Sequence, residues 1–585
     1  MSAQARKQSD APREGRRPAL RVALWTGLVA LYVASRIAAG FTVAANWDEF
    51  ALLDRAATSA RTGVLGGGGR PGLATLVLMP FAADCQDEIA AVRQARMLWV
   101  GFTLCFLAGL GALLRQVCAH SKHTTSDAWL GVGLLALVPA FLEWSLQVRT
   151  DQLALAFGLW GGVALLASRQ RPAWALVSGL LFGAGYLATQ KIVYVAALVG
   201  VLALGQLRAA RELRPGREAL RGVLAAAAFA ATVAGFDAAT AVRLDVPDGH
   251  SAMSSLTPAV VGQQLSEFAY YRKTIGYSQY LEILPTLGPH LFLLAALVVV
   301  TAASSRRRAL RTEPLWVAWA TLAVGACVAA FHASAFAYFW MTLGLFPAVA
   351  LAVSGDSLRA ALPGPRARVA ALATAGVWLV LGAQGVFRAA ELSIDTQAVQ
   401  RESLAFVHRN FDDSDSGFHP EHGPFCRNEP KPFNLYFSQV LYRHFAGEQR
   451  ETYTRNFLAN LRSRRVKFVV ESFRLNQFPV EIRRFLAENY QPYRASVFVA
   501  GRQLAGASGE SVDFELIVPG RYRWLPFEAP SRLRIGGHTL APGETAELDV
   551  GSHRADFVED VAGGMLVLAV NDPPDVAPLS FYKTY

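Results

Sequence analysis

Two adjacent carboxylates are the strongest chemical signal in the sequence. Asp48 and Glu49 stand in the segment AANWDEFALL, directly after an apolar run at 20–41. At a membrane surface, one such carboxylate can accept a proton from an attacking hydroxyl group while the other orients the nucleophile or a cation. The same pattern is typical of a helix N-terminus, with Asn46 as the cap and two acids in the first turn. The sequence leaves both interpretations open.

A second acid, Asp151, stands in EWSLQVRTDQLALAF, with Glu143 and Arg149 close by. Asp151 fits the N-cap of the following helix, paired with Arg149, and it also fits a site shared with Asp48. Both aspartates lie where apolar segments end on the same side of a membrane. A site for a lipid-borne substrate has to lie at that level, and this favours a shared site.

The composition indicates that these acids belong to a membrane protein. Of the 585 residues, 53% are hydrophobic and only 17% are charged, whereas soluble proteins have about 25% charged residues. Long uncharged segments such as 22–34, 193–204 and 288–300 account for the deficit. The net charge of +11 comes from short Arg clusters between apolar segments. We interpret these clusters as topology signals and not as a nucleic-acid surface.

The apolar runs predict about eleven transmembrane helices, because about 20 apolar residues cross the hydrocarbon layer. They lie near 20–41, 94–116, 127–146, 151–168, 172–189, 190–206, 219–242, 286–304, 315–333, 335–354 and 369–388. Lys and Arg concentrate before the first run and in alternate loops, which we therefore expect on the cytoplasmic side. The odd number of spans places everything beyond residue 388 outside the cytoplasm.

The chain divides into four predicted parts. Residues 1–19 form a disordered cytoplasmic tail, and 20–390 form an all-α polytopic membrane domain. An extracytoplasmic α/β domain at 391–505 and a β-sandwich-like domain at 506–585 follow, because short alternating segments separated by turn signals replace the mixed pattern. The five cysteines show no CxxC pair, so we expect neither a metal cluster nor a disulfide framework from Cys85, Cys105, Cys118, Cys327 and Cys426.

The order of the motifs resembles the GT-C membrane glycosyltransferases of the protein O-mannosyltransferase and lipid A aminoarabinose transferase type (PMT-like, ArnT-like). The resemblance covers roughly residues 20–390. The motifs that support it are, in their order along the chain, the Asp-Glu pair, GRPGLATLVLMPF (69–81), AVRQARMLWVGFTLCFLAGLGALLRQ (91–116), the Arg-x-Asp turn at 149–151, LATQK (187–191) and YFWMTLGLFPAVAL (338–351).

This resemblance implies a GT-C-like membrane enzyme that transfers a sugar from a polyprenyl-phosphate donor to a glycan, lipid or protein acceptor on the outer face. Asp48 matches the catalytic base, Glu49 is its neighbour, and Asp151 matches the second acid of the site. A polyprenyl-phosphate donor needs no nucleotide. The sequence also lacks an Asp-x-Asp motif within a Rossmann pattern, so it does not suggest a nucleotide-sugar donor. Whether a divalent cation takes part stays open, because no ligand spacing defines a site.

The leaving phosphate of such a donor needs positive charge. Lys191 matches the lysine of the resembling motif, and Arg272 and Lys273 stand in the outer loop segment EFAYYRKTIGYSQY, which is aromatic and basic like an interfacial helix. A simple membrane anchor fits that segment equally well. The possible accessory residues of the site are Arg149, His332 and Tyr338.

A transporter or lipid flippase with an external accessory domain is the main alternative function, and a non-catalytic membrane scaffold is another. Transporters place charges at the midplane of the membrane, often in two similar halves, whereas here the acids cluster at one boundary. The richness in Ala, Arg and Gly suggests a bacterial source. We therefore expect a multi-pass protein of the bacterial inner membrane that contacts membrane lipid and no nucleic acid.

The charge bias makes a topology prediction. A reporter fused after Tyr585 should be active only outside the cytoplasm, and one inserted within 207–218 only inside it, because Lys and Arg near span ends stay cytoplasmic. Paired alkaline phosphatase and fluorescent-protein fusions measure this. A cytoplasmic Tyr585 would contradict both the odd span count and the proposed site.

Overall fold

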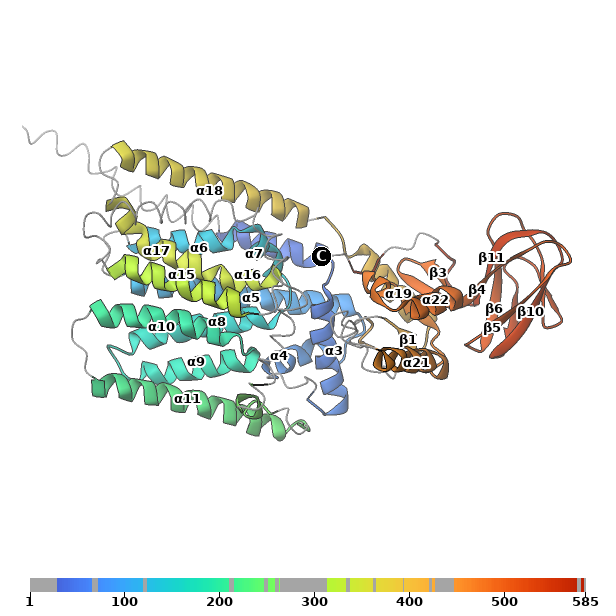
Figure 1. Cartoon of the computed structure of the whole chain (residues 1–585), viewed down its shortest axis with the longest axis horizontal. Helices are drawn as coiled ribbons and strands as arrows, with labels where there is room; N and C mark the ends of the chain where they lie inside the picture. The colour runs from blue at the N-terminus through green and yellow to red at the C-terminus, as the bar shows by residue number, and fades with distance from the viewer. Residues whose placement is uncertain are drawn as a thin grey trace, which may run out of the picture.

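The computed structural model describes a helical domain joined to a smaller C-terminal unit that contains β-sheets (Figure 1). The described residues are 29–65, 72–118, 124–209, 215–246, 251–257, 262, 313–332, 337–360, 365–392, 394–419, 423–426, 447–575 and 580–582. Arg272, Lys273 and the predicted span at 286–304 lie outside these residues.

The helical domain contains the helix Val29–Thr42 and a series of further helices along the chain. These are α3 (Trp47–Thr62), α4 (Leu73–Ala82), α5 (Glu88–Val117), α6 (Thr124–Ala136), α7 (Pro139–Trp144), α8 (Thr150–Ala167), α9 (Trp174–Ala188), α10 (Ile192–Ala209), α11 (Pro215–Ala241), α15 (Glu313–Phe331), α16 (Trp340–Leu343), α17 (Leu345–Ala360) and α18 (Pro365–Leu392).

Within the described residues, three helices, α5, α8 and α11, are long and apolar enough to cross a membrane, and a fourth span is obtained if the bent pair Val29–Thr42 and α3 counts as one. This establishes a membrane domain, while the number of eleven spans stays a prediction. The run expected as a single span at 127–146 is two helices, α6 and α7, with Pro139 at the first position of the second. Proline favours that position because its missing N–H needs no partner there.

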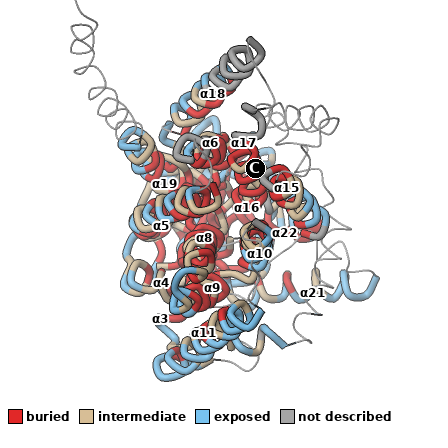
Figure 2. Tube along the Cα trace, turned by 90° about the vertical axis from the view of Figure 1, so that its left-hand side faces the viewer, coloured by how far each residue is buried: buried red, intermediate tan, exposed pale blue. Residues whose placement is uncertain are grey.

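The burial of the helices follows their place in the bundle. Figure 2 shows α8 among buried residues and α11 at the edge, with much of its surface exposed. Glycines let the inner helices approach closely: a Cβ on Gly158 of α8 would lie 2.4 Å from a methyl group of Ile192, at the start of α10. Small residues at helix contacts are the usual packing device in membranes.

Helix α3 differs from the others in its direction. The chain bends by 77° between Val29–Thr42 and α3, so that α3 runs across the end of the bundle next to the C-terminal unit (Figure 1). Its first turn forms a capping box. The Asn46 side chain accepts a hydrogen bond from the backbone N–H of Asp48 (2.9 Å), and the Glu49 carboxylate accepts one from the backbone N–H of Asn46 (2.8 Å). The interpretation of Asn46 as a cap is thus confirmed.

The C-terminal unit combines helices with two sheets. Its helices are α19 (Ala398–Asn410), α21 (Glu448–Ser463) and α22 (Val480–Asn489). Its strands are β1 (Gly417–Phe418), β2 (Phe468–Val470), β3 (Tyr490–Arg494), β4 (Val497–Gly506), β5 (Ser511–Leu516), β6 (Gly520–Pro526), β7 (Leu533–Ile535), β8 (His538–Leu540), β9 (Thr545–Leu548), β10 (Gly551–Phe557) and β11 (Val561–Leu568).

One sheet has the order β1-β2-β4-β11-β6-β9, with β3 also on β4, and the other has the order β5-β10-β7-β8. The long strand β4 belongs to both the mixed α/β part and the β-rich part of the unit. Its first residues pair with β2 and β3, and from Gly501 onward it pairs with β11. The mixed α/β part and the β-rich part therefore share one sheet, and the division at residue 505 stays a prediction.

A disulfide joins the C-terminal unit to the helical domain. Cys85, between α4 and α5, is bonded to Cys426, and their Cα atoms are 5.3 Å apart. The expectation that the cysteines form no disulfide framework is wrong in this respect. The two residues are 341 positions apart, and no local spacing could have paired them. The neighbouring Phe425 packs against Phe50 of α3 with ring centroids 5.9 Å apart.

We expect this disulfide to be detectable by thiol counting. A maleimide reagent added to the denatured protein should label three cysteines before reduction and five after it, because Cys105, Cys118 and Cys327 are free. Cys85→Ser should destabilise the protein by about 2–4 kcal/mol, whereas Cys105→Ser, at an exposed free cysteine, should change the melting temperature little. Five labelled thiols before reduction would rule the bond out.

Candidate active site

The Glu49 carboxylate points into the protein and binds Arg96 of α5. Arg96 donates from Nε to Oε1 (2.8 Å) and from Nη2 to Oε2 (2.7 Å), and both side chains are fully buried. Such a two-point pair has the fork geometry of the strongest charge-assisted hydrogen bonds. Because the carboxylate is sealed from solvent in this arrangement, we expect Glu49 to act by holding α3 in place.

The same ion pair closes a network around the start of α3. Arg96 also donates to the backbone carbonyls of Val43 (2.7 Å) and Ala44 (3.1 Å). Glu49 Oε1 accepts a further hydrogen bond from the backbone N–H of Val148 (2.9 Å). The pair thus joins the bend before α3 to the segment that leads into α8.

Asp48 lies beside this network and remains partly accessible. Its Oδ2 is 2.6 Å from Nη1 of Arg149, and the two side chains are 24% and 6% exposed. Arg149 is fixed in turn, because its Nε donates to Gln147 (2.9 Å) and its carbonyl accepts from the indole of Trp99 (2.6 Å). Of the two adjacent carboxylates, Asp48 is therefore the accessible one.

Asp151 forms a second ion pair with Lys191. Its Oδ1 is 3.0 Å from Nζ, and the Asp151 and Lys191 side chains are 5% and 23% exposed. The alternative that Asp151 caps α8 and pairs with Arg149 is wrong: Arg149 occupies the N-cap position, Asp151 lies in the first turn, and its carboxylate accepts a hydrogen bond from Lys191. Thr189 and Thr342 lie beside this pair.

The ring of Tyr338 brings the two ion pairs together. Its centroid is 4.0 Å from the guanidinium carbon of Arg149 and 4.6 Å from Nζ of Lys191. Trp144 lies on another side of Arg149, at 5.0 Å. These cation–π contacts place both cations over aromatic faces. The structure therefore gathers Asp48, Arg149, Asp151, Lys191 and Tyr338 into one cluster, although they come from four separate segments.

His332 lies next to this cluster in an aromatic environment. Its Nδ1 is 3.0 Å from the hydroxyl of Tyr194, and its ring stacks on Phe339 at 3.6 Å. Phe339 also contacts Lys191. The sequence analysis did not name Tyr194, which follows Lys191 by one helical turn, and this i, i+3 spacing is the signal that could have found it. Among the described residues, no group of three or more His, Cys, Asp or Glu could hold a metal ion.

The cluster is electrically balanced, with two carboxylates facing two cations. Charged groups at such depth persist when they are paired, because an isolated buried charge is costly. Asp48 and Lys191, whose side chains are 24% and 23% exposed, are the more accessible members of the two pairs.

No protein-family model matches the sequence, and no curated protein matches it significantly. Several solved structures are similar to the chain. An oligosaccharyltransferase from Archaeoglobus fulgidus, in complex with Zn and sulfate, is 11% identical with a TM-score of 0.47, over 94% of this chain and 99% of that one. ArnT from Cupriavidus metallidurans bound to undecaprenyl phosphate is 13% identical with a TM-score of 0.49, over 81% and 98%.

The arabinosyltransferase EmbB from Mycobacterium smegmatis is also similar, with 12% identity and a TM-score of 0.41 over 94% of this chain and 64% of that one. These solved proteins are GT-C glycosyltransferases, the class that the motif order resembles. At these identities and TM-scores, a proposed function rests on the geometry of the site.

The two adjacent carboxylates should respond differently to neutralisation. Glu49→Gln leaves Arg96 as a buried unpaired charge, which should cost about 3–5 kcal/mol. Asp48→Asn keeps the backbone hydrogen bonds of the capping box and an amide oxygen that can accept from Arg149, and Asp48 is 24% exposed, so it should cost clearly less than Glu49→Gln. Thermal unfolding of both variants in the same detergent measures the difference. Equal melting temperatures would contradict the structural role of Glu49.

Proposed function

We propose that the protein is an integral-membrane glycosyltransferase that moves a sugar from a polyprenyl-phosphate donor to a hydroxyl group of an acceptor. The observation that supports this most directly is the meeting of Asp48–Arg149 and Asp151–Lys191 on the ring of Tyr338. A lipid phosphate positions the anomeric carbon of its sugar at the depth of the headgroups. Transfer from such a donor is helped there by a base and by positive charge that neutralises the leaving phosphate.

In this proposal the acceptor hydroxyl attacks the anomeric carbon from the face opposite the phosphate. Its oxygen forms the new glycosidic bond, its proton passes to Asp48, and the bond between the anomeric carbon and the phosphate oxygen breaks, with inversion. The polyprenyl phosphate leaves with the bonding electrons. Lys191 and Arg149 offset the charge that develops on the phosphate, which is where fixed positive charge lowers the barrier most.

The ion pairs orient the groups of the site in this proposal. Arg149 holds the Asp48 carboxylate at 2.6 Å, and Asp151 holds Lys191 at 3.0 Å. The base and the two cations are therefore fixed relative to one another before any sugar is transferred.

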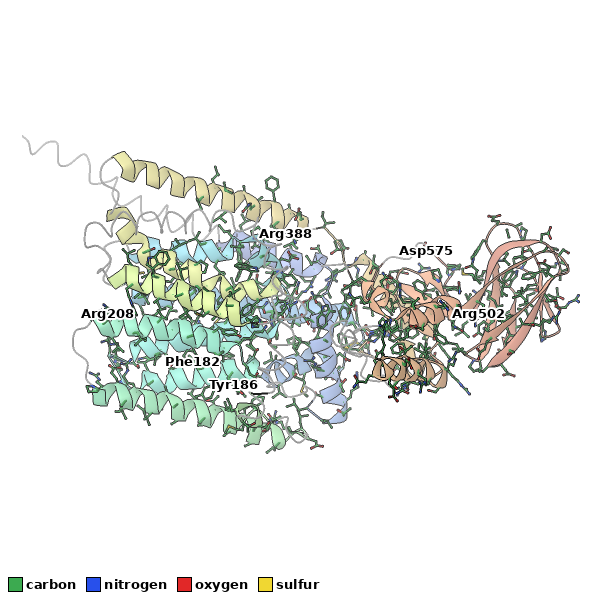
Figure 3. The ribbon with its side chains drawn as sticks, in the orientation of Figure 1. Phe182, Tyr186, Arg208, Arg388, Arg502 and Asp575 are labelled. Atoms are coloured by element: carbon green, nitrogen blue, oxygen red, sulfur yellow. A yellow bond between two sulfur atoms is a disulfide. The ribbon has the colours of Figure 1, made fainter. Side chains whose placement is uncertain are left out.

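The orientation of the protein is part of the proposal. We place the N-terminus in the cytoplasm and the C-terminal unit outside it, in a bacterial inner membrane with about eleven spans. Figure 3 shows Arg208 and Arg388 at opposite ends of the helical domain, with Arg388 at the end nearer the C-terminal unit. Arg208 stands at the predicted cytoplasmic loop. The Cys85–Cys426 disulfide supports an outer location for the other end, because disulfides persist in oxidising compartments.

The donor sugar is a hexose or a pentose in this proposal, and the acceptor is a glycan, a lipid or a protein. Arg272 and Lys273 remain candidates for donor binding, beside Lys191. A transporter or flippase is the alternative, and it would move a lipid without cleaving it. Release of polyprenyl phosphate from a panel of polyprenyl-phosphate sugars by the purified protein separates the two.

The chemical step makes a prediction about two site variants. Asp48→Asn should still bind the donor yet transfer sugar about 100-fold more slowly, because an amide cannot accept the proton. Lys191→Ala should chiefly weaken donor binding, because it removes charge that faces the phosphate. Donor titration and single-turnover release of polyprenyl phosphate measure both effects.

Asp395→Asn is the matched control for this experiment, since Asp395 is an accessible aspartate paired with Arg401 away from the cluster. It should transfer sugar at the normal rate. Normal transfer by Asp48→Asn would show that the base is elsewhere, and absence of any polyprenyl phosphate from the unmodified protein with every donor would favour the transporter.

A further inference from the structure

The described residues after β11 reach from the C-terminal unit to the helical domain. They are 569–575 and 580–582, here named the C-terminal strap. Asp572 and Asp575 contact α19 and β3, and Phe581 and Tyr582 contact α3. Figure 3 labels Asp575 on this path, above the α/β part of the unit. A terminal segment that crosses its own domain in this way needs specific contacts to hold it.

The first half of the strap is fastened to α19 and β3. Arg409 of α19 pairs with Asp572 (2.7 Å), and Asn410 Oδ1 accepts from the backbone N–H of Asp572 (3.2 Å). Tyr493 donates its hydroxyl to the carbonyl of Asp572 (2.9 Å) and accepts, at its own carbonyl, from the N–H of Asp575 (2.6 Å). The hydrogen bonds from Arg409 hold the pKa of Asp572 below its usual value. Asp572 is therefore ionised at neutral pH and can pair with Arg409.

The second half of the strap reaches the residues directly before α3. The N–H of Phe581 donates to the carbonyl of Glu471 (3.1 Å), and the Phe581 carbonyl accepts from Nε2 of Gln400 (3.0 Å). The same Gln400 amide accepts from the N–H of Ala45 (2.7 Å) and donates to its carbonyl (2.8 Å). Gln400, with no exposed surface, thus links Phe581 to the residue before the Asn46 cap.

Aromatic rings complete the contact on α3 itself. Phe50 is fully buried and lies 5.5 Å from the ring of Phe581 and 5.9 Å from that of Tyr582. Phe581 and Tyr582 are 2% and 4% exposed and contact each other edge to face at 4.9 Å. Phe50 follows Asp48 by two residues in the first turn of α3. The strap therefore packs against the same helical turn that carries the proposed base.

We propose that Phe581 and Tyr582 are positioning residues that hold the first turn of α3 so that Asp48 faces Arg149. The inference rests on the proposed function, because it assigns a consequence to the place of Asp48. The Glu49–Arg96 pair links this turn to α5, and the strap contacts it through Phe50. A catalytic group displaced by about 1 Å can lose about 100-fold in rate, so a loose first turn would slow the chemical step.

Loss of the contact between the strap and Phe50 should affect the chemical step and not donor binding. Lys191 and Asp151 belong to segments at the starts of α10 and α8, and the strap contacts described above do not involve them. Loss of the strap contact should therefore leave donor affinity nearly unchanged while it lowers the turnover number. A residue that merely stabilised the C-terminal unit would lower the amount of folded protein and leave the turnover number of each folded molecule intact.

The test uses the full chain with Phe581→Ala, assayed for donor-dependent release of polyprenyl phosphate. We expect kcat to fall about 10- to 100-fold, with less than about twofold change in donor KM and in the Kd for the donor. Phe581→Leu keeps an apolar side chain against Phe50 and should recover much of the loss. Phe527→Ala, at an exposed phenylalanine of the β-rich region, is the matched control and should keep normal kcat.

A double variant tests whether Phe581 acts through Asp48. If it does, Asp48→Asn with Phe581→Ala should be no slower than Asp48→Asn alone, because the base is already lost and residues that act as a unit are non-additive. Losses that multiply in the double variant would overturn the positioning role. If Phe581→Ala does not fold, Phe581→Leu carries the test, with an expected loss of about threefold or more in kcat that is likewise absent in the Asp48→Asn background.

The outcomes separate this inference from the function on which it rests. Normal kcat in Phe581→Ala, together with a slow Asp48→Asn, would overturn the role of the strap and leave the proposed function standing. Normal transfer in Asp48→Asn would overturn the assignment of the base, whatever Phe581 does.

Discussion

The buried ion pair between Glu49 and Arg96 is the contact on which the geometry of the site depends. Two charges without solvent are tolerated only if every oxygen and nitrogen is satisfied, and here the remaining hydrogen bonds go to the backbone at Val43, Ala44 and Val148. The bend before α3, the first turn of α3 and the approach to α8 are therefore fixed together. Asp48 and Arg149 flank this network, and it therefore sets the distance between them.

The C-terminal unit is built into this framework. It reaches the helical domain through the Cys85–Cys426 disulfide, through Gln400 and through the aromatic contact of the C-terminal strap with Phe50. All three attachments lie on or beside α3 and the start of α5. An interface of this kind restrains relative motion more than a single flexible linker does.

The polar cluster occurs where charge is otherwise expensive. Arg149 and Lys191 each have a carboxylate partner, and the ring of Tyr338 lies against both. Interactions between charges strengthen as solvent is excluded, which makes the cluster sensitive to any anion that enters it. The balance of two acids and two cations thus explains how so much charge is tolerated in one cluster.

The sequence by itself determined the features that depend on near neighbours. The apolar runs indicated a membrane domain, and the Asn46 cap with its acidic first turn could be recognised within four residues. Asp48, Asp151 and Lys191 could be proposed for one site because their segments end at the same membrane boundary and their motifs follow a known order. Tertiary structure decided the partners. Asp151 binds Lys191 and not the nearby Arg149, Glu49 binds Arg96, Cys85 binds Cys426, and Phe581 reaches Phe50. Helical periodicity and capping are set by adjacent residues, whereas these pairings require segments tens to hundreds of residues apart to meet, and only the packed fold brings them together.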